Sequence, residues 1–236
     1  MNKLFSIFIM LFCSISLFGK ETLIVGTNAE FPPFEYMEKN KIVGFDIDLI
    51  NKIGEIIGKD IKISNLSFDG LLPALQAKKI DLVVAGMTVT EERKKFVDFS
   101  KDYFIATQVL ILPENSTISN LNDFETNKLG TILGYTGDLL ASKNKNIQKI
   151  QYNTPAMAIM DLKSGKIQGI ILDSAPALGY VKNTKGLKIL DINEEQEKYA
   201  IALRKGNEKL VEEINSAIDE IIKTGYYDQL VKKYFN

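Results

Sequence analysis

The sequence predicts an α/β fold in which strands and helices alternate along the chain. Short apolar runs of the kind found in buried strands recur at residues 23–27, 81–85, 129–132 and 169–172. The segments between them repeat apolar residues every three or four positions, as one face of a helix does. This alternation favours parallel strands with helices on both faces of the sheet.

In the first half of the chain, most predicted elements have a recognisable start or stop signal. A helix is expected from Asp46, as its N-cap, to Gly58, as its stop, because isoleucines recur at helical spacing between them. Residues 61–63 alternate Ile with Lys, as a half-buried strand does. A second helix is expected to open at Asp69, and a short third helix at Thr90, with two glutamates in its first turn.

The second half of the chain repeats the pattern. Thr154 is expected to cap a helix with Pro155 at its first position and Gly165 past its end. Asn207 is expected to cap a long amphipathic helix that stops at Gly225. The predicted elements are strands at 129–132, 147–152, 169–172 and 199–203, and helices beginning near 137, 155, 175, 208 and 226.

The composition excludes several classes of chemistry. The chain of 236 residues has no His and a single Cys, so a Ser-His-Asp triad, a Cys-His dyad, a His-ligated metal and an internal disulfide are all excluded. A net charge of -1, from 29 basic and 30 acidic residues, is not typical of a nucleic-acid binder. We expect the protein to bind no cofactor and no metal. Its length suits one large domain or two small ones.

Residues 1–19 are predicted to be a signal peptide. A charged start at Lys3 precedes an apolar stretch from residue 4 to residue 18, which is too short to cross a bilayer comfortably. The protein is therefore expected to be exported, with a periplasmic location. Cys13 is a candidate for lipid attachment, although the bulky Phe12 precedes it where such sites favour a small residue.

Four segments fall where the strands of an open α/β sheet end, and ligands bind at such positions. They are VGTNAEFPPFEYMEKNKIVGFDIDL (25–49), FDGLLPALQAKKIDLVVAGMTVTEERKKFVDFS (68–100), LGTILGYTGD (129–138) and GIILDSAPA (169–177).

Together these segments resemble the polar amino-acid family of periplasmic solute-binding proteins, the ligand-capturing components of ABC importers. The resemblance covers nearly all of the chain after the signal. It implies the two-lobe periplasmic binding protein fold (type II), hinge-linked by two crossing strands, with the ligand in the inter-lobe cleft. Carried onto this chain, lobe 1 comprises residues 20–105 plus 199–236, and lobe 2 comprises residues 110–194.

The resemblance assigns the two charged groups of an amino acid to Arg93 and Asp173. A guanidinium fork matches the two oxygens of a carboxylate, and an aspartate pairs with an ammonium group. Each residue also has an ordinary structural interpretation, Arg93 as a surface arginine in a charged helix and Asp173 as a helix cap. The other backbone-binding positions that the resemblance implies are Ala85, Gly86 and Thr88 in lobe 1 and Thr136 and Gly137 in lobe 2.

The side chain of the ligand is expected to lie between aromatic rings. Phe31 and Phe68 match the family's aromatic pair, although core packing explains most phenylalanines. Leu133 and Tyr135 complete the wall contributed by lobe 2.

The identity of the amino acid is less clear from the sequence. Asn28 departs from the aspartate that some cationic amino-acid binders of the family have, which favours glutamine or another neutral ligand. Glu30 offers a negative charge nearby, and the overall pattern GTNAEFPPFEY places arginine or lysine slightly ahead of glutamine.

Capture of an amino acid for a membrane permease is therefore the leading interpretation, with the protein acting as a monomer. The alternative is an enzyme on the same scaffold that resembles the periplasmic cyclohexadienyl or arogenate-type dehydratases, with Glu30 or Asp173 as its acid-base group. A partner for a sensor or chemoreceptor would use the same closed, ligand-bound state.

Overall fold

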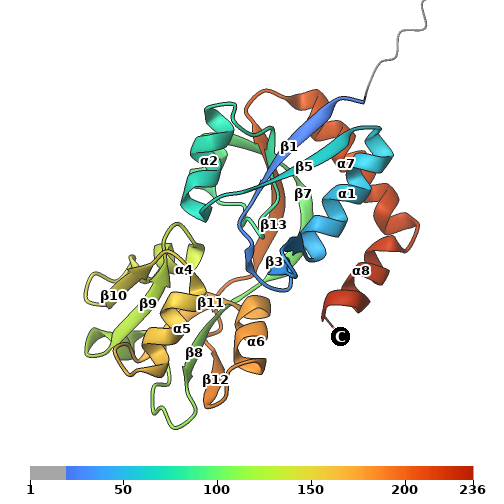
Figure 1. Ribbon diagram of the computed structural model, residues 1–236. Coiled ribbons are helices and arrows are strands. Elements are labelled where there is room, and N and C mark those ends of the chain that lie inside the picture. Colours follow the sequence, from blue (N-terminus) through green and yellow to red (C-terminus); the bar gives the residue numbers. More distant parts are fainter. Residues whose placement is uncertain (1–19, 236) are drawn as a thin grey trace, which may run out of the picture.

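The computed structural model describes residues 20–235, so the predicted signal peptide and Cys13 lie outside the described residues. Figure 1 shows two sheets in separate halves of the molecule, each flanked by helices. No helix of residues 20–235 is both long and apolar enough to cross a membrane.

The first lobe is built on a five-stranded sheet. The order of its strands is β5 (Asp60–Asn65), β1 (Thr22–Thr27), β6 (Leu82–Val83), β13 (Glu197–Arg204) and β7 (Val97–Ala106). Strand β1 runs parallel to β5 and β6, whereas β13 runs antiparallel to β6 and β7. The remaining elements of this lobe are α1 (Phe45–Ile57), α2 (Phe68–Gln76), α3 (Glu91–Lys94), α7 (Glu208–Lys223) and α8 (Tyr226–Phe235), with a small sheet of β2 (Glu30–Phe31), β3 (Glu35–Glu38) and β4 (Lys41–Val43).

The second lobe has its own five-stranded sheet. The order of its strands is β10 (Gln148–Tyr152), β9 (Lys128–Ile132), β11 (Gly169–Asp173), β8 (Gln108–Pro113) and β12 (Leu187–Asp191). The helices of this lobe are the 3-10 helix η1 (Leu121–Glu125), α4 (Thr136–Ala141), α5 (Pro155–Lys163) and α6 (Ser174–Lys182).

The chain passes between the two sheets twice. Strand β7 ends at Ala106 and β8 begins at Gln108, so a single residue separates a strand of one sheet from a strand of the other. The return runs through residues 192–196, between β12 and β13. These two short connections lie at the junction of the lobes in Figure 1.

The expectation of parallel sheets was therefore wrong in part. Both sheets are mixed, because the strands on either side of the crossings, β7 with β13 and β8 with β12, pair antiparallel. The predicted elements did not include β7, β8 or β12. Strand β8 follows β7 directly, without the intervening helix that connects parallel strands.

The predicted starts of two helices were confirmed, because the cap side chain of each accepts a hydrogen bond from the first turn. The hydroxyls of Thr90 and Thr154 accept hydrogen bonds from the backbone N–H groups of Arg93 and Met157. Asp46 is not an N-cap, because α1 begins one residue earlier, after Gly44, and the Asp46 carboxylate is buried and bonded elsewhere.

Apolar helix faces cover the sheets. In α7 the residues that face the core are fully or nearly buried at helical spacing: Leu210, Ile214, Ala217, Ile218 and Ile221. They belong to the same core as Leu49, Ile50 and Ile53 of α1. This packing fixes the first sheet, so the ends of its strands are held rigidly where the lobes meet.

Candidate functional site

A cleft between the lobes is lined by residues from both sheets. The lining residues are Phe31, Phe68, Gly86, Thr88 and Arg93 from the first lobe and Tyr135, Thr136 and Asp173 from the second. The cavity between them is about 10 Å³, which is close to the space that one water molecule occupies. The lobes must therefore separate before a larger molecule enters.

Arg93 reaches into this cleft from α3. Its side chain is buried, and Nη1 donates to the carbonyl oxygen of Thr88 at 2.6 Å while Nη2 donates to the carbonyl oxygen of Gly134 at 3.0 Å. Its guanidinium carbon lies 5.3 Å from the ring centre of Phe68. Burial lowers the pKa of Arg93, and the neighbouring acids oppose that shift. The guanidinium is therefore a buried cation that contacts both lobes, unlike a surface arginine.

Asp173 brings a carboxylate to the same cleft at the end of β11. Its Oδ1 accepts from Nε2 of Gln108 at 2.7 Å, and its Oδ2 accepts from the hydroxyl of Tyr199. Asp173 occupies the N-cap position of α6, but its side chain makes no capping hydrogen bond. The capping interpretation is therefore wrong for the side chain, which points toward the cleft instead.

Burial raises the pKa of Asp173 to about 7, and the nearby negative charge of Glu197 adds to the shift. Hydrogen bonds from Tyr199 and Gln108 act in the opposite direction because they stabilise the ionised form. A cation placed beside Asp173 would favour ionisation further.

Glu197 is bonded to two residues of the cleft lining and was not predicted from the sequence. Its Oε2 accepts hydrogen bonds from the hydroxyls of Thr88 and Thr136, each at 2.7 Å, so one carboxylate oxygen bridges the two lobes. It stands at the start of β13, directly after the return crossing. In the sequence it follows two other acids, Glu194 and Glu195, and no local pattern distinguishes it from them.

Gln108 was missed for a similar reason. It stands at the start of β8, directly after the first crossing, and its Nε2 donates to Asp173 and, at 3.1 Å, to the hydroxyl of Thr136. The two crossings thus contribute Gln108 and Glu197 to the polar centre of the cleft.

The aromatic residues form one cluster across the cleft. The ring centre of Tyr135 lies 5.4 Å from that of Phe31 and 4.6 Å from that of Phe68. The Tyr135 hydroxyl donates to Oδ1 of Asn28 at 3.1 Å, and Nδ2 of Asn28 donates to the carbonyl oxygen of Leu66. Asn28 therefore fixes the ring of Tyr135 through a hydrogen bond between lobes.

Four other predicted positions lie around the cleft rather than in its lining. Leu133 is 37% exposed, and Ala85 is buried in the core of the first lobe. Glu30 receives a hydrogen bond from Tyr180 at its backbone carbonyl, and its carboxylate makes no hydrogen bond or ion pair within residues 20–235. Gly137 is buried in the first turn of α4, where a Cβ would lie 2.9 Å from Oε1 of Gln108.

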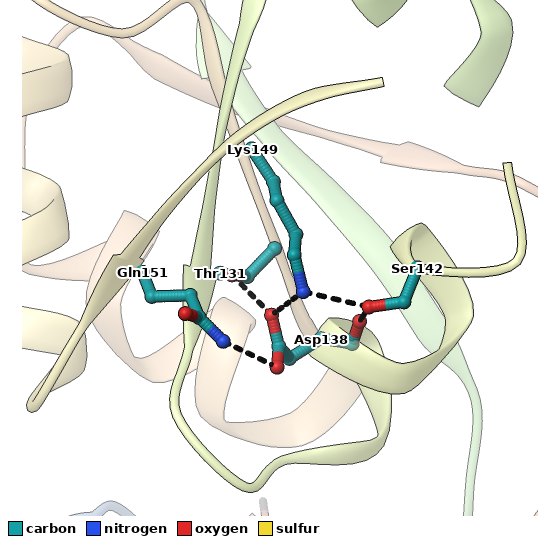
Figure 2. A network of polar contacts seen from close by, with 5 residues as sticks. All are labelled: Thr131, Asp138, Ser142, Lys149 and Gln151. Carbon is teal, nitrogen blue, oxygen red and sulfur yellow. Dashed lines mark hydrogen bonds and ion pairs between the residues drawn. The ribbon is translucent and has the colours of Figure 1, made fainter. Parts of the chain in front are cut away.

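A polar network holds α4 in place below the cleft (Figure 2). The buried carboxylate of Asp138 accepts from Thr131 Oγ1 at 2.7 Å, Lys149 Nζ at 2.8 Å and Gln151 Nε2 at 2.8 Å. These hydrogen bonds lower the pKa of Asp138 against the effect of burial. The network anchors the helix to β9 and β10, and so fixes the helix turn that carries Thr136.

Comparison with known proteins shows which family the chain belongs to. The family model of bacterial extracellular solute-binding proteins, family 3, matches residues 23–236. The chain belongs to this family. The family match and the two-lobe architecture agree with the resemblance seen in the sequence.

Three comparisons illustrate the membership. A probable histidine-binding protein of Neisseria gonorrhoeae is 36% identical over 219 residues, which cover 89% of this chain and 82% of the relative. Two solved structures of an ancestral arginine-binding protein, one bound to arginine and one to glutamine, are 42% and 43% identical, each with a TM-score of 0.88. Each of these two matches covers 92% of this chain and 99% of the chain in the solved structure.

As a member of this family, the protein captures an amino acid for an ABC importer. Its matched relatives are binding proteins, and none of the three points to the dehydratase alternative.

Proposed function

We propose that this family 3 protein captures a basic amino acid, arginine or lysine, in preference to glutamine. The observation that supports the proposal is an acid in excess at the cleft. Arg93 supplies one positive charge, whereas Asp173 and Glu197 supply two negative ones. The zwitterionic part of any amino acid matches one charge of each sign, so one acid is left over.

That remaining charge favours a cationic side chain, because a charge enclosed by the closed cleft is costly without a partner. In this arrangement Arg93 takes the ligand carboxylate, Asp173 takes the ammonium group, and the rings of Phe31, Phe68 and Tyr135 take the methylene groups. The other contacts are proposed to come from Asn28, Ala85, Gly86, Thr88, Leu133, Thr136 and Gly137, with Glu30 at the rim. A cationic head also suits the faces of these rings.

Delivery is proposed to use closure of the two lobes over the ligand. We place lobe 1 at residues 20–105 plus 199–236 and lobe 2 at residues 110–194, with the two crossings as the hinge. A ligand in the cleft adds contacts to both lobes at once, so it favours the closed state that the permease recognises. The protein is proposed to act as a monomer in the periplasm, with Cys13 as the candidate for a lipid anchor.

Calorimetric titration with L-arginine, L-lysine, L-histidine and L-glutamine tests the ligand class. We expect a basic amino acid to bind at least about tenfold more tightly than glutamine, a difference of about 1.4 kcal/mol. Tighter binding of glutamine would refute the basic preference, and no binding of any amino acid would refute capture itself.

The variant Glu197→Gln removes the excess charge and keeps the shape of the side chain. We expect it to reduce the preference for basic ligands by about tenfold, with little change for glutamine. Glu195→Gln is the matched control, because it is an exposed acid two residues earlier in the same segment. If both variants kept the wild-type preference, another group would have to set the ligand charge.

A further inference from the structure

Two carboxyl groups are buried together behind the wall of the cleft in the first lobe. Glu35 lies on β3 and Asp46 in the first turn of α1, and both are 0% exposed. Oδ2 of Asp46 accepts from the backbone N–H of Gly86 at 2.8 Å and from the hydroxyl of Tyr103 at 2.7 Å. Gly86 itself lines the cleft, so Asp46 is one contact away from the ligand.

The other carboxyl oxygens of the pair have no donor. Both oxygens of Glu35 and Oδ1 of Asp46 are fully buried, and no group of residues 20–235 donates a hydrogen bond to them. No lysine or arginine in that part of the chain forms a salt bridge with Glu35 or Asp46. The titratable groups that act on the pair are Tyr103, from β7, Tyr135, from the second lobe, and Tyr227, from α8.

Two neighbouring carboxylates cannot both stay ionised in such a place, since neither has a counter-charge. Asp46 receives two hydrogen bonds that stabilise an anion, and Glu35 receives none. A proton on Glu35 would turn one orphaned oxygen into a donor toward Asp46 and remove the repulsion.

We propose that Glu35 and Asp46 share one proton, carried by Glu35, and that the pair positions the Gly86 amide in the wall of the cleft. The neighbouring charges agree with this assignment. Burial raises the pKa of Glu35 well above its usual range, and Asp46 raises it further. Burial also raises the pKa of Asp46, but only to about 6, because its hydrogen bonds stabilise the ionised form.

Gly86 has little freedom to move once Asp46 holds it. Its φ is +51°, and a Cβ there would lie 2.5 Å from Cε1 of Phe31. The backbone therefore passes directly against a ring that lines the cleft. A shift of the Asp46 carboxylate would displace both the Gly86 amide and the surface on which Phe31 rests.

Infrared spectroscopy and urea unfolding test the shared proton in the wild type and in Glu35→Gln. We expect the wild type in heavy water at neutral pH to show a C=O band of a protonated carboxyl group that is missing from the spectrum of Glu35→Gln. Asp173→Asn should keep the band, which separates Glu35 from the other buried acid whose pKa is raised. The matched control, Glu38→Gln, lies on the same strand at an exposed position and should also keep it.

The pH dependence of unfolding gives a second readout that a purely structural role would not move. The folded wild type holds one proton more than its unfolded chain between the ordinary pKa of a glutamate and the raised one. Its unfolding constant should therefore rise about tenfold per pH unit relative to that of Glu35→Gln, from about pH 5 upward. The backbone amide resonance of Gly86 should keep its position in Glu35→Gln and shift in Asp46→Ala.

Absence of the infrared band in the wild type, or equal pH slopes in the wild type and Glu35→Gln, would overturn the proposal. An unchanged Gly86 resonance in Asp46→Ala would overturn the positioning role. If Asp46→Ala does not fold, a shift of the Gly86 resonance in wild-type protein as the pair loses its proton at alkaline pH replaces that readout, and no shift there would count against the role. None of these measurements depends on which amino acid the protein binds.

Discussion

Replacement of Arg93 gives the most direct test of the proposed ligand-binding site. Arg93 is 8% exposed, and its replacement with alanine removes the guanidinium together with its hydrogen bonds to the carbonyl oxygens of Thr88 and Gly134. In the proposed complex the same guanidinium holds the ligand carboxylate. The substitution would leave that carboxylate in the closed cleft without its cation.

Truncation of one partner of a buried, hydrogen-bonded charge pair costs about 2–5 kcal/mol. That range corresponds to a loss of affinity of roughly 30-fold to 4,000-fold, at 1.4 kcal/mol for each factor of ten. Burial places Arg93 within this range rather than in the range of exposed pairs, which contribute about 1 kcal/mol or less. Arg93→Lys should give an intermediate loss, because an ammonium keeps the charge but not the planar fork.

Calorimetric titration with the tightest-binding amino acid measures the effect. Lys94→Ala is the matched control, since Lys94 is the next residue of the same helix, is exposed, and pairs with Glu91. We expect its affinity to equal that of the wild type. A loss of less than about threefold, or 0.7 kcal/mol, for Arg93→Ala would show that Arg93 does not hold the carboxylate.

Two further predictions concern Asp173 and the network around Asp138. Because the pKa of Asp173 is raised to about 7, the affinity for an amino acid should fall as pH is lowered through 7, by up to tenfold per pH unit. Calorimetric titration of Asp173→Asn should show weaker binding without this pH dependence. Asp173→Asn should also weaken amino acids more than their deaminated acids, and equal losses would make Asp173 a structural residue. Lys149→Met removes one donor to Asp138 and should lower the free energy of unfolding in urea by about 1.5–3 kcal/mol. The control Lys143→Met, at an exposed position, should change it little. Equal effects of the two substitutions would contradict the network's role.

Local sequence patterns predicted most helices and strands correctly. The caps at Thr90 and Thr154 depend on bonds across three residues, and the apolar stripe of α7 depends on spacing along one helix. Such signals are complete within a short segment, so they can be read without the fold. Asp46 was misplaced because an acid near a helix start looks like a cap, whereas its real partners, Gly86 and Tyr103, are 40 and 57 residues away.

The cleft was predicted only in outline. The motif around Arg93 and the acid at the end of β11 marked two of its charges, and the structure brings both to one cavity. Glu197 remained hidden, since the hydroxyl of Thr88 that it accepts from lies 109 residues earlier in the sequence. Leu133, which was expected in the wall, directly follows β9 and is 37% exposed.

The resemblance to a known family pointed to Arg93 and Asp173 as the charged pair. The sequence by itself determined the α/β class, the order of most elements and the lack of imidazole chemistry. These depend on composition and on patterns that span a few residues. The tertiary structure alone decided that the crossing strands run antiparallel, that they deliver Gln108 and Glu197 to the cleft, and that Glu35 lies buried beside Asp46. Those contacts arise from the order of strands in the two sheets, which joins residues that no local pattern connects.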